Sequence, residues 1–166
     1  MTLEALTPFR SPAFRRPTED PRPLPYLTSP GNDATGGIDI TIEVFLRSAR
    51  MRSEGREGLR LSRNSFRDMY WTIAQMLTHH TSNGCNLRPG DLLGSGTVSG
   101  PACESLGCLM EMTRQGAEPL ALPTDESRSF LADGDEVIFR AHCARDGYVR
   151  IGFGECRGTI EMRNEE

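Results

Sequence analysis

The sequence contains no lysine, because all 19 of its basic residues are arginine. A catalytic lysine is therefore excluded within these 166 residues. The arginines are outnumbered by 23 acidic residues, which gives a formal net charge of -4 and a pI near 5.5. General nucleic-acid binders normally present a basic face, so this charge argues against a nucleic-acid partner.

Long apolar runs and paired cysteine motifs are also missing. No stretch reaches the roughly 20 apolar residues that cross a membrane, and we expect neither a signal peptide nor a membrane partner. The five cysteines are odd in number, unevenly spaced and without a CxxC motif, which favours neither a disulfide framework nor a zinc site. They are Cys85, Cys103, Cys108, Cys143 and Cys156. We therefore expect reduced thiols in a soluble, cytoplasmic protein.

The remaining composition favours a turn-rich β protein over a helical bundle. Hydrophobic residues make up 37% of the chain, whereas glycine and proline are frequent, with 17 and 11 residues. A chain of this length suits one domain that buries about two-thirds of its unfolded surface.

Residues 1–37 form a proline-rich segment. Proline fixes φ and offers no backbone N–H, so we expect an extended, largely irregular arm. A free-standing domain rarely begins with so long a segment without regular structure. Either the arm lies across a partner surface, or the chain begins partway through a larger fold.

The next residues predict a hairpin and a helix. Apolar residues alternate over residues 38–47, as in a half-buried strand, and residues 59–62 predict the returning strand after a charged loop at residues 51–58. Asn64 or Ser65 is a suitable N-cap for a helix with apolar residues at three- and four-residue spacing, ending near Gly84. The spacing is carried by Phe66, Met69, Tyr70, Ile73 and Leu77.

Short strands and tight turns are predicted for the rest of the chain. Asp133-Gly134 and Asp146-Gly147 are typical of hairpin turns. The predicted strands are residues 109–113, 120–122, 130–131, 137–143 and 149–153, with a last strand at Thr159-Ile160 before an acidic tail. The expected fold is therefore α+β, mainly β with one helix.

The most informative segment is residues 83–101. Pro89-Gly90 suits the centre of a type II turn, since proline fixes φ and glycine accepts a positive φ. Small residues dominate from Gly94 to Gly100, and we expect a strand whose backbone approaches a ligand or another strand closely. Thr97 is the residue that we expect to face a substrate carboxylate or carbonyl.

Glu111 and the pair His79-His80 are the remaining candidates. On a strand at residues 109–113, Glu111 is either a solvent-facing residue or a buried acid that needs a partner, and the residues alone favour the first alternative. His79 and His80 lie in the last turn of the predicted helix. Neighbouring residues on a helix face apart, so a capping or core role is favoured over a shared site.

Several of these motifs together resemble the fumarylacetoacetase family. The resemblance covers nearly the whole chain and implies the C-terminal part of the family's catalytic domain, an incomplete portion of a mixed β-sandwich or roll. The motifs are Asp20–Leu27, Tyr70-Trp71-Thr72, Asn83–Leu93, Ser95-Gly96-Thr97, Asp133–Val137, Gly147-Tyr148 and Arg150–Gly154.

The resemblance implies a hydrolase that cleaves fumarylacetoacetate to fumarate and acetoacetate, the last step of tyrosine breakdown. In the family, the glutamate at the position of Glu111 hydrogen-bonds a histidine, and together they activate water for attack on a carbonyl carbon. The threonine at the position of Thr97 contacts the substrate. The family members are dimers, so a homodimer is expected for the complete enzyme.

The resemblance also implies groups that have no counterpart in this sequence. The family holds Mg²⁺ or Ca²⁺ with four carboxylates, and these, with the catalytic histidine and lysine, precede the proline-rich segment. No spacing among the scattered acids resembles a replacement cage. These are Asp39, Glu43, Asp91 and Glu104. We therefore expect the isolated chain to be inactive and a complementary N-terminal portion to be a possible partner.

Two other functions remain open from the sequence. One is a non-catalytic β module that dimerises or binds a small acid. The other is an isomerase or decarboxylase of the wider fumarylacetoacetate hydrolase superfamily.

Overall fold

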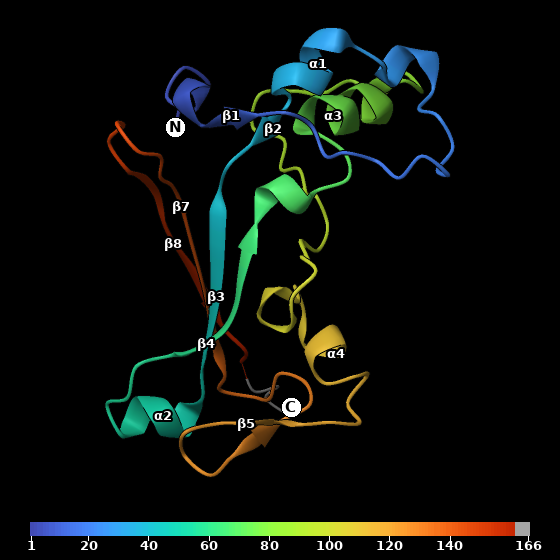
Figure 1. Ribbon diagram of the computed structural model, residues 1–166. Helices are drawn as coiled ribbons and strands as arrows, with labels where there is room; N and C mark the ends of the chain where they lie inside the picture. The colour runs from blue at the N-terminus through green and yellow to red at the C-terminus, as the bar shows by residue number, and fades with distance from the viewer. Residues whose placement is uncertain (162–166) are drawn as a thin grey trace.

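A four-stranded antiparallel sheet forms the centre of the molecule (Figure 1). The computed structural model describes residues 1–161, so the end of the predicted acidic tail lies outside the described residues. The strand order is β4-β3-β7-β8. The strands are β3 (Thr41–Arg47), β4 (Leu59–Ser65), β7 (Glu136–Cys143) and β8 (Ile151–Thr159).

The two faces of this sheet have opposite character, because successive side chains of a strand point to opposite faces. The register pairs Ile42 with Ala141 and Val44 with Phe139 on one face, which is apolar. Glu43 pairs with Arg140 on the other face. That face carries ion pairs, among them Arg60–Glu43 at 3.1 Å, Arg140–Glu155 at 2.6 Å and Arg157–Glu136 at 3.4 Å, together with the apolar pair Phe45 and Ile138.

Smaller elements lie at the two ends of the sheet (Figure 1). At one end, β1 (Arg10–Ser11) pairs with β2 (Gly37–Ile38), and a core cluster joins Leu6, Phe9, Ile38 and Cys143. At the other end, β5 (Leu120–Ala121) pairs with β6 (Ser127–Arg128) beside a second cluster of Leu46, Met51 and Leu122. Both ends of the sheet therefore have their own small core.

The mixed α+β class, mainly β, is confirmed, but the predicted single helix is one of four within residues 1–161. The helices are α1 (Pro30–Thr35), α2 (Ala49–Ser53), α3 (Ile73–Thr81) and α4 (Leu109–Met112), with 3-10 turns η1 (Thr7–Phe9), η2 (Pro25–Leu27), η3 (Phe66–Asp68) and η4 (Cys103–Ser105). The three additional helices have four to six residues each, too few for an apolar period to appear in the sequence. Ser29 and Ser48 cap α1 and α2 by accepting a backbone N–H bond.

The predicted helix begins later than its apolar spacing indicated. Strand β4 continues to Ser65, and α3 begins only after Thr72, which forms a capping box with Gln75. The Thr72 Oγ1 accepts from the Gln75 N–H at 3.2 Å, and the Gln75 Oε1 accepts from the Thr72 N–H at 3.0 Å. The Gln75 Nε2 also donates to the Leu27 carbonyl at 3.0 Å, which ties α3 to the proline-rich segment.

Several predicted strands and one predicted loop are wrong. Phe130-Leu131 forms no strand, and Thr159 is the last residue of β8 instead of the start of a separate strand at Thr159-Ile160. Residues 92–100 have no regular structure, and residues 109–113 contain α4 instead of a strand. Within residues 51–58, helix α2 continues to Ser53, because Met51 is buried beneath the sheet's end and Ser48 caps the helix. The small residues within 92–100 provide no side chains to pack on a sheet face, which explains the missing strand there.

The predicted hairpin turns differ in outcome. Asp133-Gly134 is a turn but not a hairpin, because β6 before it pairs with β5, whereas β7 after it pairs with β3 and β8. The hairpin loop at Asp146-Gly147 joins β7 and β8, and Gly147 has a φ of +82°. The type II turn is also confirmed, since the Asp91 N–H donates to the Arg88 carbonyl at 3.1 Å and Gly90 has a φ of +99°. Across residues 1–161, no helix has the length and apolar character needed to cross a membrane.

Candidate active site

Glu111 lies at the third position of α4, where its carboxylate accepts several hydrogen bonds. The Ser99 hydroxyl donates to both carboxylate oxygens, at 2.8 and 3.0 Å. The backbone N–H groups of Gly107 and Cys108 donate to Oε2, at 2.9 and 3.2 Å. We call these three donor residues, Ser99, Gly107 and Cys108, the Glu111 cradle.

The cradle favours the charged form of Glu111. Donation from Ser99 is the main cause that lowers the pKa of Glu111 below its ordinary value. Slight burial opposes this, whereas Gly107 and Cys108 lower the pKa of Glu111 further. Glu111 is exposed, so the structure matches neither alternative from the sequence fully: the residue faces solvent, yet it has partners. The carboxylate is consequently ionised at neutral pH and accessible to a further donor.

Thr97 lies beside the cradle through Gly107. A Cβ added to Gly107 would lie 2.5 Å from the Thr97 Cγ2, 2.4 Å from the Val98 carbonyl oxygen and 2.8 Å from the Ser99 Oγ. Only glycine fits between the two segments without a shift. The structure therefore brings the two predicted site residues, Thr97 and Glu111, to the same place, although neither lies on a strand.

Two further hydrogen bonds fix the segment that carries Thr97. The Asn64 Nδ2 on β4 donates to the Val98 carbonyl at 2.6 Å, and this attaches the irregular segment to the edge of the sheet. The Gly100 N–H donates to the Ser105 carbonyl at 2.8 Å, which closes the loop between Thr97 and α4. The position of Thr97 is thus set by β4 and by this loop.

The sequence did not indicate Ser99, Gly107 or Cys108. The spacing Cys108-x-x-Glu111 is that of a capping box, in which the third helical residue accepts a backbone N–H from the cap. Cysteine is not one of the usual N-cap residues, so the sequence did not indicate a capping box at this position. Read this way, the spacing predicts a helix start at residue 109 instead of a strand.

The two adjacent histidines lie on α3, with other partners. The His79 Nδ1 is 2.9 Å from the Tyr26 hydroxyl, and the His80 Nε2 is 3.3 Å from the Cys85 Sγ. Both imidazoles are exposed, so of the two roles favoured from the sequence, capping or core, the core role is wrong. Within residues 1–161, neither forms a hydrogen bond with Glu111.

The carboxylates of the described residues do not fit a divalent cation. Asp39 is 3.8 Å from Arg67, Glu43 is 3.1 Å from Arg60, and Asp91 accepts from the Arg88 N–H at 2.8 Å. In the part of the chain that the structure describes, no three His, Cys, Asp or Glu side chains gather closely enough to hold a metal ion.

Comparison with known proteins identifies the family. The family model described as fumarylacetoacetate hydrolase C-terminal matches residues 19–161. The chain therefore belongs to the fumarylacetoacetate hydrolase family, of which it carries a C-terminal portion. Within that family, its curated relatives include fumarylacetoacetases from Bos taurus, Homo sapiens and Arabidopsis thaliana.

The sequence identity to these relatives is high, but the alignments cover nearly all of this chain and only about a third of each relative. The bovine and human proteins are 47% and 46% identical over 158 residues, which is 95% of this chain and 35% of each relative. The Arabidopsis protein is 47% identical over 161 residues, 96% of this chain and 35% of its own length. The chain thus spans about a third of the length of these relatives.

Proposed function

We propose that this chain supplies part of the active site of a fumarylacetoacetase. The complete enzyme would hydrolyse the carbon–carbon bond of fumarylacetoacetate to give fumarate and acetoacetate. The observation that carries the proposal is the cradle, which holds an ionised, solvent-accessible Glu111 beside Thr97. The name shared by the relatives, fumarylacetoacetase, supports this substrate.

Glu111 would act by orienting an imidazole. An ionised carboxylate accepts the N–H of one ring nitrogen, which leaves the other nitrogen free to take a proton from water. The resulting hydroxide adds to the ketone carbonyl carbon, the carbon–carbon bond breaks, and the electron pair leaves with the acetoacetate carbon. The imidazolium then returns the proton that it took from water to that carbon, so atoms and charge balance.

Thr97 would position the substrate. Its side chain lies against Gly107, and the Gly107 N–H donates to Glu111. A substrate carboxylate or carbonyl group that is held by the Thr97 hydroxyl would therefore lie close to the Glu111 carboxylate, because only Gly107 separates the two side chains. Such fixed geometry between substrate and catalytic groups is a large part of catalysis.

The base and the groups that stabilise the leaving carbon would come from polypeptide outside these residues. None of the hydrogen bonds described for residues 1–161 joins a histidine to Glu111, and lysine is absent from the sequence. We therefore expect the chain alone to show little turnover. The complementary portion of the enzyme would restore it.

The test follows the absorbance decay of fumarylacetoacetate. The chain is measured alone, and then mixed with the part of the Bos taurus enzyme that lies outside the matched 158 residues. We expect turnover only in the mixture, with a loss of about 100-fold or more for Glu111→Gln, the usual scale for removing acid–base assistance. Turnover by the chain alone in the presence of a chelator would contradict the proposal.

A further inference from the structure

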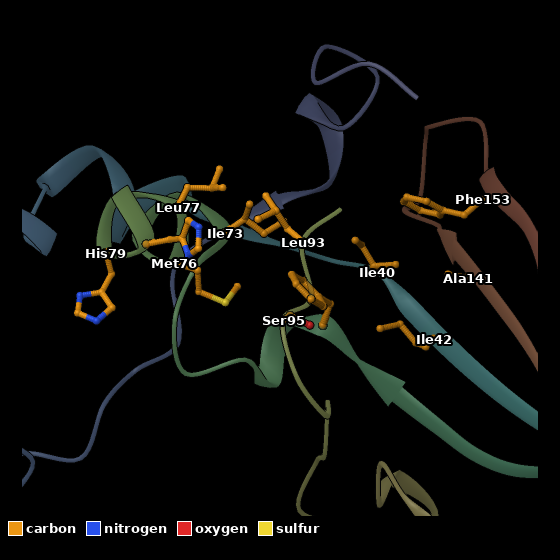
Figure 2. Close-up of a pocket in the computed structure, with 13 residues that line it drawn as sticks. Ile40, Ile42, Ile73, Met76, Leu77, His79, Leu93, Ser95, Ala141 and Phe153 are labelled. Atoms are coloured by element: carbon orange, nitrogen blue, oxygen red, sulfur yellow. The ribbon is translucent and has the colours of Figure 1, made fainter. Parts of the chain in front are cut away.

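An apolar groove of about 650 Å³ runs beside the segment that leads to Thr97. Figure 2 shows side chains of α3 on one side, side chains of the sheet on the other, and Leu93 and Ser95 between them. Ile73 and Leu77 line the helical wall, and Ile42 and Phe153 line the sheet wall. Ser95 lies two residues before Thr97, so the groove and the candidate active site share one stretch of backbone.

The groove continues along the apolar face of the central sheet. Phe139 lies on that face in β7, which has hydrogen-bonded neighbours on both sides, yet 47% of its surface is exposed. Phe153 is 44% exposed on β8. The exposure of Phe139 cannot come from an edge position. It shows that the layer over this face is incomplete, whereas on the opposite face, which carries the ion pairs, Ile138 of the same strand is only 5% exposed.

The side chains that line the groove and its concave shape indicate what kind of partner would fit. No arginine, aspartate or glutamate lines it, and its ionisable members are His79 and His80. A charged peptide or nucleic acid would find no complementary charge there. The groove is also concave, so a second copy would bring two hollows together. A convex, apolar element of another polypeptide fits both properties.

The relatives supply a source for that element. About two-thirds of the bovine, human and Arabidopsis fumarylacetoacetases lies outside the part that matches this chain. A segment of this portion seated in the groove would contact Leu93 and Ser95 directly. It would then be held close to the Thr97 and Glu111 site, where the proposed function requires additional groups.

We infer that the apolar groove is the docking surface for the portion of a fumarylacetoacetase that lies outside these residues, and that an apolar segment of that portion completes the layer over the sheet. This inference rests on the proposed function and adds to it the surface through which the site is completed.

The test uses two groove variants that should leave the fold of the chain intact. Phe153→Glu and Ile73→Glu replace side chains that are 44% and 39% exposed, so neither change buries a charge in the chain itself. Val149→Glu is the matched control, because Val149 is 85% exposed and does not line the groove. Circular dichroism checks that all three variants remain folded.

Each variant is co-expressed with the non-matching portion of the Bos taurus enzyme as a separate chain, and the dissociation constant of the complex is measured. We expect the unmodified chain and Val149→Glu to bind alike, and each groove variant to bind at least tenfold more weakly. Equal binding by the groove variants, or no complex with the unmodified chain, would overturn the inference. The inference would also be overturned if the chain formed a homodimer and both Phe153→Glu and Ile73→Glu dissociated it.

The two proposals fail in different ways. A complex that forms through the groove without turning over fumarylacetoacetate would leave the inference standing and remove the proposed function. Turnover that persists unchanged with Phe153→Glu and Ile73→Glu would support the proposed function and overturn the inference about the groove.

Discussion

Glu126 and Glu111 are both held by hydroxyl and neighbouring donors, but their surroundings differ in charge. Glu126 accepts from the hydroxyls of Ser48 and Thr124, both at 2.5 Å, and from the Arg128 guanidinium at 3.0 Å. Glu111 accepts from one hydroxyl, two backbone N–H groups and the Cys108 thiol, and among residues 1–161 it forms no ion pair. The charge of Glu126 is therefore balanced by an arginine of the same chain, whereas the charge of Glu111 is not balanced by any cation of residues 1–161.

This difference separates a structural carboxylate from the one that we propose to be functional. Arg128 also binds Asp135, which is fully buried, at 2.8 Å, so Glu126 belongs to a closed network that holds β6 to the start of β7. An arginine near Glu111 would compete with an incoming imidazolium. A carboxylate with hydrogen bonds but no cation is what the orientation of a catalytic base requires.

The largest expected effect comes from opening the closed network. Arg128→Ala leaves the buried Asp135 without its cation, and we expect the free energy of unfolding to fall by about 3–5 kcal/mol. Urea unfolding measures it. Arg114→Ala, which removes an exposed pair with Glu118, is the control and should change stability by less than about 1 kcal/mol. Similar losses for both variants would contradict the structural role of Arg128.

A smaller effect is expected when the cradle itself is distorted. Gly107→Ala places a Cβ 2.4 Å from the Val98 carbonyl oxygen, so the backbone must move and the free energy of unfolding should fall by about 1–3 kcal/mol. The shift should also weaken the Gly107 N–H bond and raise the pKa of Glu111 toward its ordinary value. Urea unfolding and carbon-13 NMR measure the two effects.

Gly94→Ala is the matched control for Gly107→Ala, because an added Cβ at Gly94 meets nothing within 4 Å. An unchanged pKa of Glu111 in Gly107→Ala would show that Gly107 does not hold the cradle together.

The pH dependence of stability should distinguish the two carboxylates further. Donation from Ser48 and Thr124 lowers the pKa of Glu126 from 4.5 to about 2. Its contribution is therefore fully present above pH 4.5 and is lost as the pH falls toward 2. Glu126→Gln should flatten the loss of stability over that range in urea unfolding, whereas Glu111→Gln should flatten it less. An equal response of the two variants would remove the distinction.

The smallest change in stability is expected from the loss of the Ser99 hydroxyl. Ser99→Ala removes the main cause of the lowered pKa of Glu111, so this pKa should rise toward its ordinary value. Stability should change by about 1 kcal/mol or less, because the bond is exposed. Carbon-13 NMR follows the titration, with Ser95→Ala as the control, since the Ser95 hydroxyl bonds only its neighbour's carbonyl. An unchanged titration in Ser99→Ala would contradict the assignment of Ser99 to the cradle.

The elements that the sequence predicted are those with a long period or an unambiguous turn. Strands β3 and β4, the turn at Pro89-Gly90 and the hairpin at Asp146-Gly147 all follow from local rules. The resemblance to the family, which the comparisons confirm, also came from the sequence.

The cradle could not be predicted because it depends on contacts between segments. A helix as short as α4 shows too few residues for a helical period to be told from strand alternation, so Glu111 was assigned to a strand. The contact of Gly107 with Thr97 and Ser99 joins segments eight or more residues apart and leaves no local pattern. The late start of α3 has a similar cause, since the bond from Gln75 to Leu27 spans 48 residues.

The side-chain amide of Asn64 has a consequence for any ligand that touches the outer strand of the sheet. Through its bond to Val98, it couples the backbone beside Thr97 to β4, one of the two outer strands of the sheet. A molecule that pairs with this edge, however far it sits from Glu111, would pull on the threonine that we expect to hold the substrate. Binding at the strand edge and substrate binding at Thr97 would then change together, because both depend on the position of the same backbone segment.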